Sequence, residues 1–189
     1  MVWHYGDPLR EQRYLDDGTG VVDLGDRDGL AVVWTGFRPD VGQFTGEFRS
    51  GTPDCLGGYE VRLPRESVAA LLAAGRLAGL WAYTARRIAA GVPLADVDAP
   101  RIPPPHRLVR LYIDGSAESF PEPGTPLLVL RSDPGEPVGF LGSSAYHHEL
   151  GLIGLAYVTA DTDAESVLMV DGMVAGQEAV SRPSPGRPG

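Results

Sequence analysis

Alternation of apolar and polar side chains is clearest near the middle of the chain, where Tyr59–Leu63 places Glu60 and Arg62 between apolar residues. This period of two predicts a half-buried β-strand. Apolar residues then recur at i, i+3 and i+4 in two groups, which predicts a short helix closed by Gly75 and a longer one closed by Gly91. The two apolar faces consist of Val68, Leu71 and Leu72, and of Leu77, Leu80, Trp81, Thr84, Ala85 and Ile88.

The first part of the chain predicts a helix followed by two strands. Asp7 is placed to cap a helix that begins at Pro8 and continues to about Asp16. Apolar and β-branched residues at 21–24 and 30–34 predict two strands joined by a turn.

Two segments lack a hydrophobic period. Residues 35–56 contain Gly or Pro every few positions and predict an irregular loop, although a loop of about 20 residues is unusual inside a compact domain. Residues 94–106 contain three consecutive prolines, which exclude a helix and predict a linker between two domains.

After this linker, short apolar segments separated by turn signals predict a small antiparallel β-barrel over residues 107–182. Asp171-Gly172 is a strong signal for a two-residue hairpin, and residues 183–189 read as a flexible tail. The sequence therefore predicts an α+β protein with a first domain over residues 1–93. The strands predicted in the barrel are 107–113, 126–130, 137–146, 152–159, 167–170 and 173–175.

The segments that carry a resemblance to known proteins lie at both ends of the chain and in its middle. Residues 58–93, which include GYEV and LWAYTARRIAAGVP, resemble the folate-binding YgfZ proteins, relatives of the glycine-cleavage T protein. The N-terminal segment HYGDPLREQRYLDDGTGVVDL is similar to the family's opening helix and first strand. Two later segments, PPHRLVRLYIDGSAESFPEPGTPL and EPVGFLGSSAYHHELGLIGLAYV, are similar to its C-terminal barrel. The resemblance implies a folate-binding domain like that of the T protein, internally shortened at residues 35–56.

The chain also departs from this family. Its KGCYxGQE signature, which follows an Ile-Pro dipeptide, is missing, and Ile102-Pro103 leads directly into the barrel segment. The GQE at residues 176–178 lacks the preceding KGCY, so we interpret it as a chance match. Thr84 stands where the family usually has an acid, so any ion pair of that acid is lost.

The resemblance implies tetrahydrofolate or another folate as the cofactor, and it suggests which residues bind it. Glu60 would hold the pterin ring, because the adjacent N–H donors of pterin suit a bidentate carboxylate. Arg87 would pair with the carboxylates of the folate tail. Tyr59, Tyr83 and Trp81 flank these positions, and their rings are expected at the cofactor site. The alternatives are a solvated Glu60, a solvated Arg87 and a Trp81 that belongs to the core.

The role that the resemblance implies is tetrahydrofolate-dependent support of iron–sulfur cluster assembly or repair, with iron–sulfur client or assembly proteins as partners. It does not imply a defined catalytic reaction. Two alternatives stay open. One is an aminomethyltransferase of the glycine-cleavage T-protein class, and the other is a degenerate paralogue that acts only as a structural or interaction protein.

Composition excludes several other classes. The net charge is -9, and all 16 basic residues are arginine, so a broad nucleic-acid surface is not expected. Cys55 is the single cysteine, which excludes an intramolecular disulfide. The sequence has neither an apolar run of roughly 18 residues nor a signal peptide, so we expect a cytoplasmic monomer without a membrane segment. No metal site is expected at His147-His148-Glu149, because adjacent strand side chains point to opposite faces.

Overall fold

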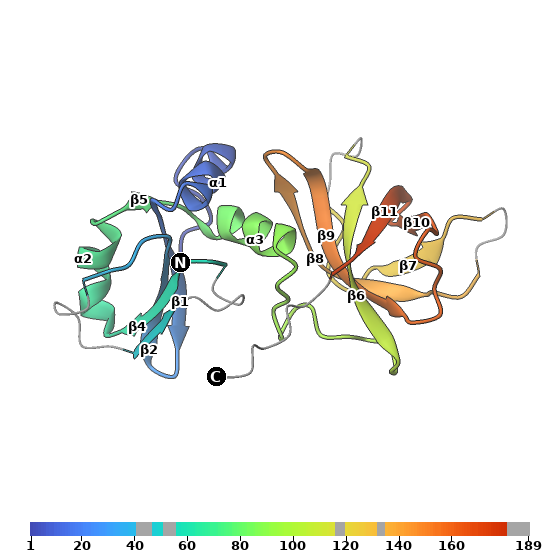
Figure 1. Ribbon diagram of the computed structural model, residues 1–189, viewed down its shortest axis with the longest axis horizontal. Coiled ribbons are helices and arrows are strands. Elements are labelled where there is room, and N and C mark those ends of the chain that lie inside the picture. Colours follow the sequence, from blue (N-terminus) through green and yellow to red (C-terminus); the bar gives the residue numbers. More distant parts are fainter. Residues whose placement is uncertain (41–46, 51–55, 116–119, 132–134, 181–189) are drawn as a thin grey trace, which may run out of the picture. The chain divides into compact units, whose positions relative to one another are not determined.

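The protein is an α+β protein in the computed structural model (Figure 1). The structure describes residues 1–40, 47–50, 56–115, 120–131 and 135–180. Within these ranges, no helix is long and apolar enough to cross a membrane. The chain divides into two compact units, Met1–Arg86 and Arg87–Gly189. The division falls inside helix α3 (Leu80–Ala89), earlier than the domain boundary expected at residue 93.

The first unit is built on a five-stranded sheet with the strand order β3-β4-β2-β1-β5. The pair β1 and β5 is parallel and the other pairs are antiparallel. Its elements before α3 are α1 (Pro8–Asp16), β1 (Gly20–Arg27), β2 (Leu30–Thr35), β3 (Glu47–Ser50), β4 (Tyr59–Leu63), the 3-10 helix η3 (Arg65–Ser67), α2 (Val68–Leu72) and β5 (Arg76–Leu77).

Helix α1 begins as its sequence predicts. The Asp7 carboxylate accepts hydrogen bonds from the backbone amides of Leu9 and Arg10, at 3.1 and 3.0 Å. These amides have no partner inside the helix, so the cap satisfies them. Pro8 occupies the first helical turn, where its missing N–H costs nothing. The predicted helix from Pro8 to Asp16 is confirmed.

One face of the sheet forms the core of the first unit. Because side chains alternate along a strand, every second residue of β1, β2 and β4 points to this face. It packs against Val68 and Leu71 of α2, the helix that lies beside the sheet in Figure 1. We call it the core face, and its buried strand residues are Val21, Ala31, Val33, Val61 and Leu63.

The segment 35–56 is not wholly irregular, so the prediction of a continuous loop is wrong. Strand β3 lies within it and pairs with β4 at the edge of the sheet, where Glu47 lies opposite Arg62 and Ser50 opposite Tyr59. Such an edge strand is defined by its pairing partner rather than by its own pattern. Residues 41–46 and 51–55, with Cys55, lie outside the described residues.

The second unit is a closed antiparallel barrel with the order β10-β11-β6-β9-β8-β7, in which β7 pairs with β10. This confirms the barrel expected from the sequence. Asp171 and Gly172 form the predicted hairpin, and both have positive φ angles, of 50° and 77°. The strands are β6 (His106–Ile113), β7 (Pro126–Val129), β8 (Gly139–His147), β9 (Gly151–Thr159), β10 (Leu168–Val170) and β11 (Met173–Ala179).

The proline-rich segment before the barrel is partly packed, although its sequence predicts only a linker. The amide of Asp98 donates to the carbonyl oxygen of Leu94 at 2.7 Å, which closes a turn. Asp98 is buried. A Cβ on Gly142 of β8 would clash with the Asp98 carboxylate, so this turn lies directly on the barrel wall.

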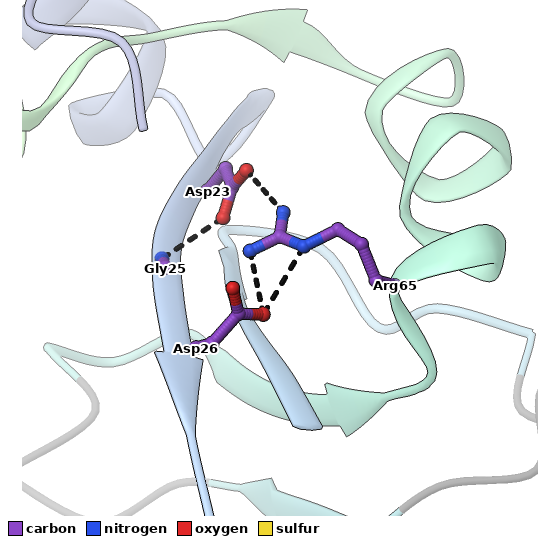
Figure 2. Close-up of polar contacts among 4 residues, drawn as sticks. All are labelled: Asp23, Gly25, Asp26 and Arg65. Atoms are coloured by element: carbon purple, nitrogen blue, oxygen red, sulfur yellow. Dashed lines mark hydrogen bonds and ion pairs between the residues drawn. The ribbon is translucent and has the colours of Figure 1, made fainter. Parts of the chain in front are cut away.

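Arg65 joins η3 to the first strand of the sheet (Figure 2). Its Nη1 lies 2.6 Å from Asp23 Oδ2, and its Nη2 and Nε lie 2.8 and 3.1 Å from Asp26 Oδ1. Asp23 also accepts a hydrogen bond from the amide of Gly25, at the bulge of β1. One guanidinium therefore bridges two carboxylates, on a side chain that is 44% exposed.

A second polar cluster lies on the outside of the barrel. Tyr112 donates to Glu178 Oε2 at 2.7 Å, and Arg110 forms an ion pair with the same carboxylate. These two donors lower the pKa of Glu178, with the tyrosine hydrogen bond as the larger cause. The cluster lies across the paired strands β6 and β11.

Replacing Arg65 by alanine should destabilise the protein by only about 0.5–1 kcal/mol, because exposed ion pairs are weakened by solvent and ions. Urea unfolding at low and high salt measures the effect, which should shrink at high salt. The matched control is Arg27→Ala, at an exposed arginine that ends β1, the strand of Asp23 and Asp26. It should reduce the free energy of unfolding by less than Arg65→Ala. A loss above about 2 kcal/mol that does not depend on salt would contradict this account.

Glu178 makes the stability of the barrel depend on pH. Because its pKa is lowered in the folded protein, its contribution is present above the pKa of the unfolded chain. The contribution is lost as the pH falls through the lower folded value. Glu178→Gln should therefore lower the stability at neutral pH and leave it little changed in acid, so that the acid limb of the stability curve becomes flatter. A carboxyl pKa equal to that of a free glutamate, measured by carbon NMR, would contradict the prediction.

Candidate functional site

The predicted pterin ligand Glu60 lies on the face of the sheet opposite the core face. Strand register places Glu60 of β4 directly across from Trp34 of β2, and Trp34 across from Val22 of β1. Residues paired across antiparallel strands project to the same face. We call this face the tryptophan face, and its residues on β1, β2 and β4 are Val22, Val32, Trp34, Glu60 and Arg62.

Helix α3 covers the indole of the tryptophan face. The Tyr83 ring centroid lies 6.2 Å from that of Trp34 and is tilted by 59°. The Arg86 guanidinium lies 6.0 Å from the centre of the Trp34 ring, within the range of a cation–π contact. Trp34 is consequently only 1% exposed. The sequence predicts Tyr83 at the site but gives no sign of Trp34, because register between strands decides that contact.

The Glu60 side chain is partly exposed and lies near a cation. Its side chain is 17% exposed, and Oε1 lies 3.7 Å from Nε of Arg62 on the same strand face. That distance makes an ion pair rather than a hydrogen bond. Arg62 also lies 3.9 Å from the exposed Asp28, so its charge is shared between two acids.

The glycine before the predicted site residues has a steric role. A Cβ on Gly58 would clash with the Trp34 indole and with the carbonyl oxygen of Thr35. The backbone that leads into β4 therefore runs against the indole. Tyr59 pairs with Thr35, so its half-buried side chain leaves the sheet on the core face, opposite to Glu60. The structure thus separates two neighbours that the sequence groups together.

Trp81 contacts the N-terminal segment. Its ring centroid lies 6.2 Å from that of Trp3 and 6.4 Å from that of His4. Its amide donates to the Trp3 carbonyl oxygen at 3.1 Å. The side chain is half-buried in this aromatic group, and a contact with a ligand stays a prediction.

A buried carboxylate fixes where α3 begins. Glu11 is 3% exposed and accepts hydrogen bonds from the amides of Tyr5, at 2.6 Å, and Gly79, at 2.9 Å. Gly79 immediately precedes α3, where free amides and the helix dipole favour a negative charge. Glu11 therefore holds the N-terminal segment and the start of α3 on the same helix, α1.

Arg87 begins the second unit and is engaged by protein groups. Nη1 lies 2.7 Å from Asp98 Oδ2 and 2.6 Å from the Val92 carbonyl oxygen, and Nη2 donates to the Ser143 hydroxyl. That hydroxyl in turn donates to Asp98 Oδ1 at 2.6 Å. The Arg87 and Asp98 side chains are each 1% exposed. A folate carboxylate would have to displace Asp98, so the predicted contact of Arg87 with a ligand stays a prediction.

The ion pair of Arg87 is made with a residue outside the helix. Asp98 of the proline-rich segment supplies the carboxylate. Asp98 also lines a hollow of about 320 Å³ beside Tyr157. The other residues that line it are Pro93, Leu94, Ala95, Ala99 and Pro100.

The His-His-Glu segment at the end of β8 is held by contacts among its own residues and with Leu150. The ring of His147 stacks on that of His148 with centroids 4.8 Å apart. Nδ1 of His147 accepts from the amides of Glu149 and Leu150, at 3.2 and 3.3 Å. Across the described part of the chain, no three His, Cys, Asp or Glu residues are grouped so that they could hold a metal ion.

Comparison with known proteins adds no relative. No family model matches the chain, and no curated protein matches it. The resemblance to the YgfZ proteins is therefore one of short sequence segments alone.

Removing one partner of the Arg87–Asp98 pair should strongly destabilise the second unit. Arg87→Met leaves the Asp98 carboxylate buried without its cation, and such changes cost about 3–5 kcal/mol. The double variant Arg87→Met/Asp98→Leu should recover part of this loss, because both charges are then removed. Urea unfolding gives the free energy of unfolding of the wild type, Arg87→Met and the double variant, and Arg131→Met, at an exposed arginine, is the control. A cost below about 1 kcal/mol for Arg87→Met would contradict a buried, coupled pair.

Proposed function

We propose that this protein binds a folate, with the pterin ring at Glu60 on the tryptophan face. The observation that carries the proposal is the register that pairs Glu60 with Trp34, because α3 brings Tyr83 and Arg86 to the same indole. A carboxylate, two aromatic rings and a cation thus gather on one side of the first unit. Binding sites for planar, polar ligands commonly combine apolar walls with a few directed polar groups.

The chemistry of pterin fits the carboxylate. The ring presents its 2-amino group and its N3–H as neighbouring donors, and an ionised carboxylate offers two acceptors in the matching geometry. The 17% exposure of the Glu60 side chain leaves this group accessible to a ligand. Its ion pair with Arg62, at 3.7 Å, is long enough to be exchanged for the shorter bonds of a bound pterin.

The cellular role proposed from the family resemblance is tetrahydrofolate-dependent support of iron–sulfur cluster assembly or repair. Because the KGCYxGQE segment is absent from the chain, this role cannot use the cysteine of that segment. The binding of folate and the cellular role are separate claims. Folate binding is tested on the purified protein, and the role is tested by the activity of an iron–sulfur enzyme in cells that lack and then regain this protein.

Folinic acid titration, followed by tryptophan fluorescence and calorimetry, should show saturable binding to the wild-type protein. Glu60→Gln keeps the size of the side chain but loses its charge and one acceptor. Because a charge-assisted contact contributes about 1.5–3 kcal/mol, this variant should bind roughly ten- to a hundredfold more weakly.

Glu66→Gln, an exposed acid on η3, is the matched control and should bind like the wild type. Tight binding that Glu60→Gln leaves unchanged would move the site elsewhere. Absence of binding to folinic acid, with a protein that unfolds cooperatively, would refute folate as the ligand.

A further inference from the structure

Two adjacent arginines of α3 have different surroundings. Arg87 is buried and engaged by Asp98, Val92 and Ser143. Arg86 is 25% exposed, and its Nε is a buried donor without a hydrogen-bond acceptor among the described residues. Buried donors in folded proteins are nearly always paired, so the Arg86 Nε requires an explanation.

The Arg86 guanidinium is held by two protein groups, and its Nε has no hydrogen-bond acceptor among the described residues. Nη1 forms an ion pair with the Asp16 carboxylate, and Nη2 donates to the Leu56 carbonyl oxygen at 3.3 Å, near the long limit of a hydrogen bond. Nε and Nη2 form one edge of the planar fork and can bind an acceptor together. A modest rotation of this partly exposed side chain would direct that edge to a ligand.

The position of Arg86 relates it to the proposed pterin site. Its guanidinium lies 6.0 Å from the Trp34 ring, and Trp34 is the cross-strand neighbour of Glu60. An acceptor at Glu60 and a donor at Arg86 therefore lie on the same face of the sheet. A ligand edge that carries donors beside an acceptor would satisfy both residues.

We propose that Arg86 reads the 4-oxo group of a pteridine whose 2-amino group and N3–H are bound by Glu60. This inference rests on the proposed folate function. In a pterin the 4-oxo oxygen is the neighbour of N3–H, so the ring edge runs donor, donor, acceptor. Glu60 accepts from the first two positions, and Nε of Arg86 donates to the third. The site is accordingly selective for 4-oxo pteridines over their 4-amino analogues, which present a donor to the guanidinium.

Folic acid and aminopterin test this selectivity, because aminopterin carries a 4-amino group in place of the 4-oxo group and therefore has no hydrogen on N3. The wild-type protein should bind folic acid at least about tenfold more tightly than aminopterin. In aminopterin the 4-amino group is a donor that faces the donor of Arg86, so no hydrogen bond forms there. Arg86→Met keeps the apolar stem beside Trp34 but removes the donors. It should lower the affinity ratio, mainly by weakening folic acid, while the part of the ratio that depends on N3–H at Glu60 remains.

Arg86→Lys retains the charge without Nε and should also lower the affinity ratio, which separates hydrogen bonding from net charge. Arg13→Met, an exposed arginine on α1, should keep the wild-type ratio. Equal binding of both ligands by the wild type, or an unchanged ratio in both Arg86 variants, would overturn the role of Arg86. If Glu60→Gln still weakens both ligands in that case, the proposed folate site stands. Absence of binding to either ligand would refute the folate function and this inference with it.

Discussion

Burial of the Trp34 indole between the sheet and α3 organises the first unit. The indole is 1% exposed, so the chain that leads into β4 must pass it without a side chain. Gly58 meets this requirement, since a Cβ there would clash with the indole and with the Thr35 carbonyl oxygen. The next residues then pair with β2, and Glu60 emerges beside the indole. One packing constraint thus explains both the glycine and the position of the carboxylate.

The position of α3 over the Trp34 indole depends on the buried Glu11 carboxylate. A carboxylate removed from water is tolerated only when it is hydrogen-bonded, and the amides of Tyr5 and Gly79 provide those bonds. Because Gly79 precedes α3, the same contact sets where the helix begins. The start of the helix in turn determines that Tyr83 and Arg86, rather than their neighbours, contact Trp34.

The sequence by itself determined those elements that depend on interactions between residues close together in the chain. The cap at Asp7 and the proline at position 8 define α1 through the free amides of a first helical turn. Alternation in Tyr59–Leu63 defines β4, because a strand exposes every second side chain to a different face. The Asp171-Gly172 turn follows from the positive φ angles that a two-residue hairpin needs. In each case the deciding interactions lie within a few residues of one another.

Tertiary structure decided which residues meet. Strand β3 carries no pattern of its own and exists through its pairing with β4. Glu60 lies beside Trp34 because β4 pairs with β2 in the register that sets these two residues opposite each other, although they are far apart in sequence. Successive helical residues are rotated by about 100°, so Arg86 and Arg87 necessarily face different directions. Which of them would meet the sheet and which would pair with Asp98 was set by long-range packing, because a helical pattern defines a face but not the partner that covers it.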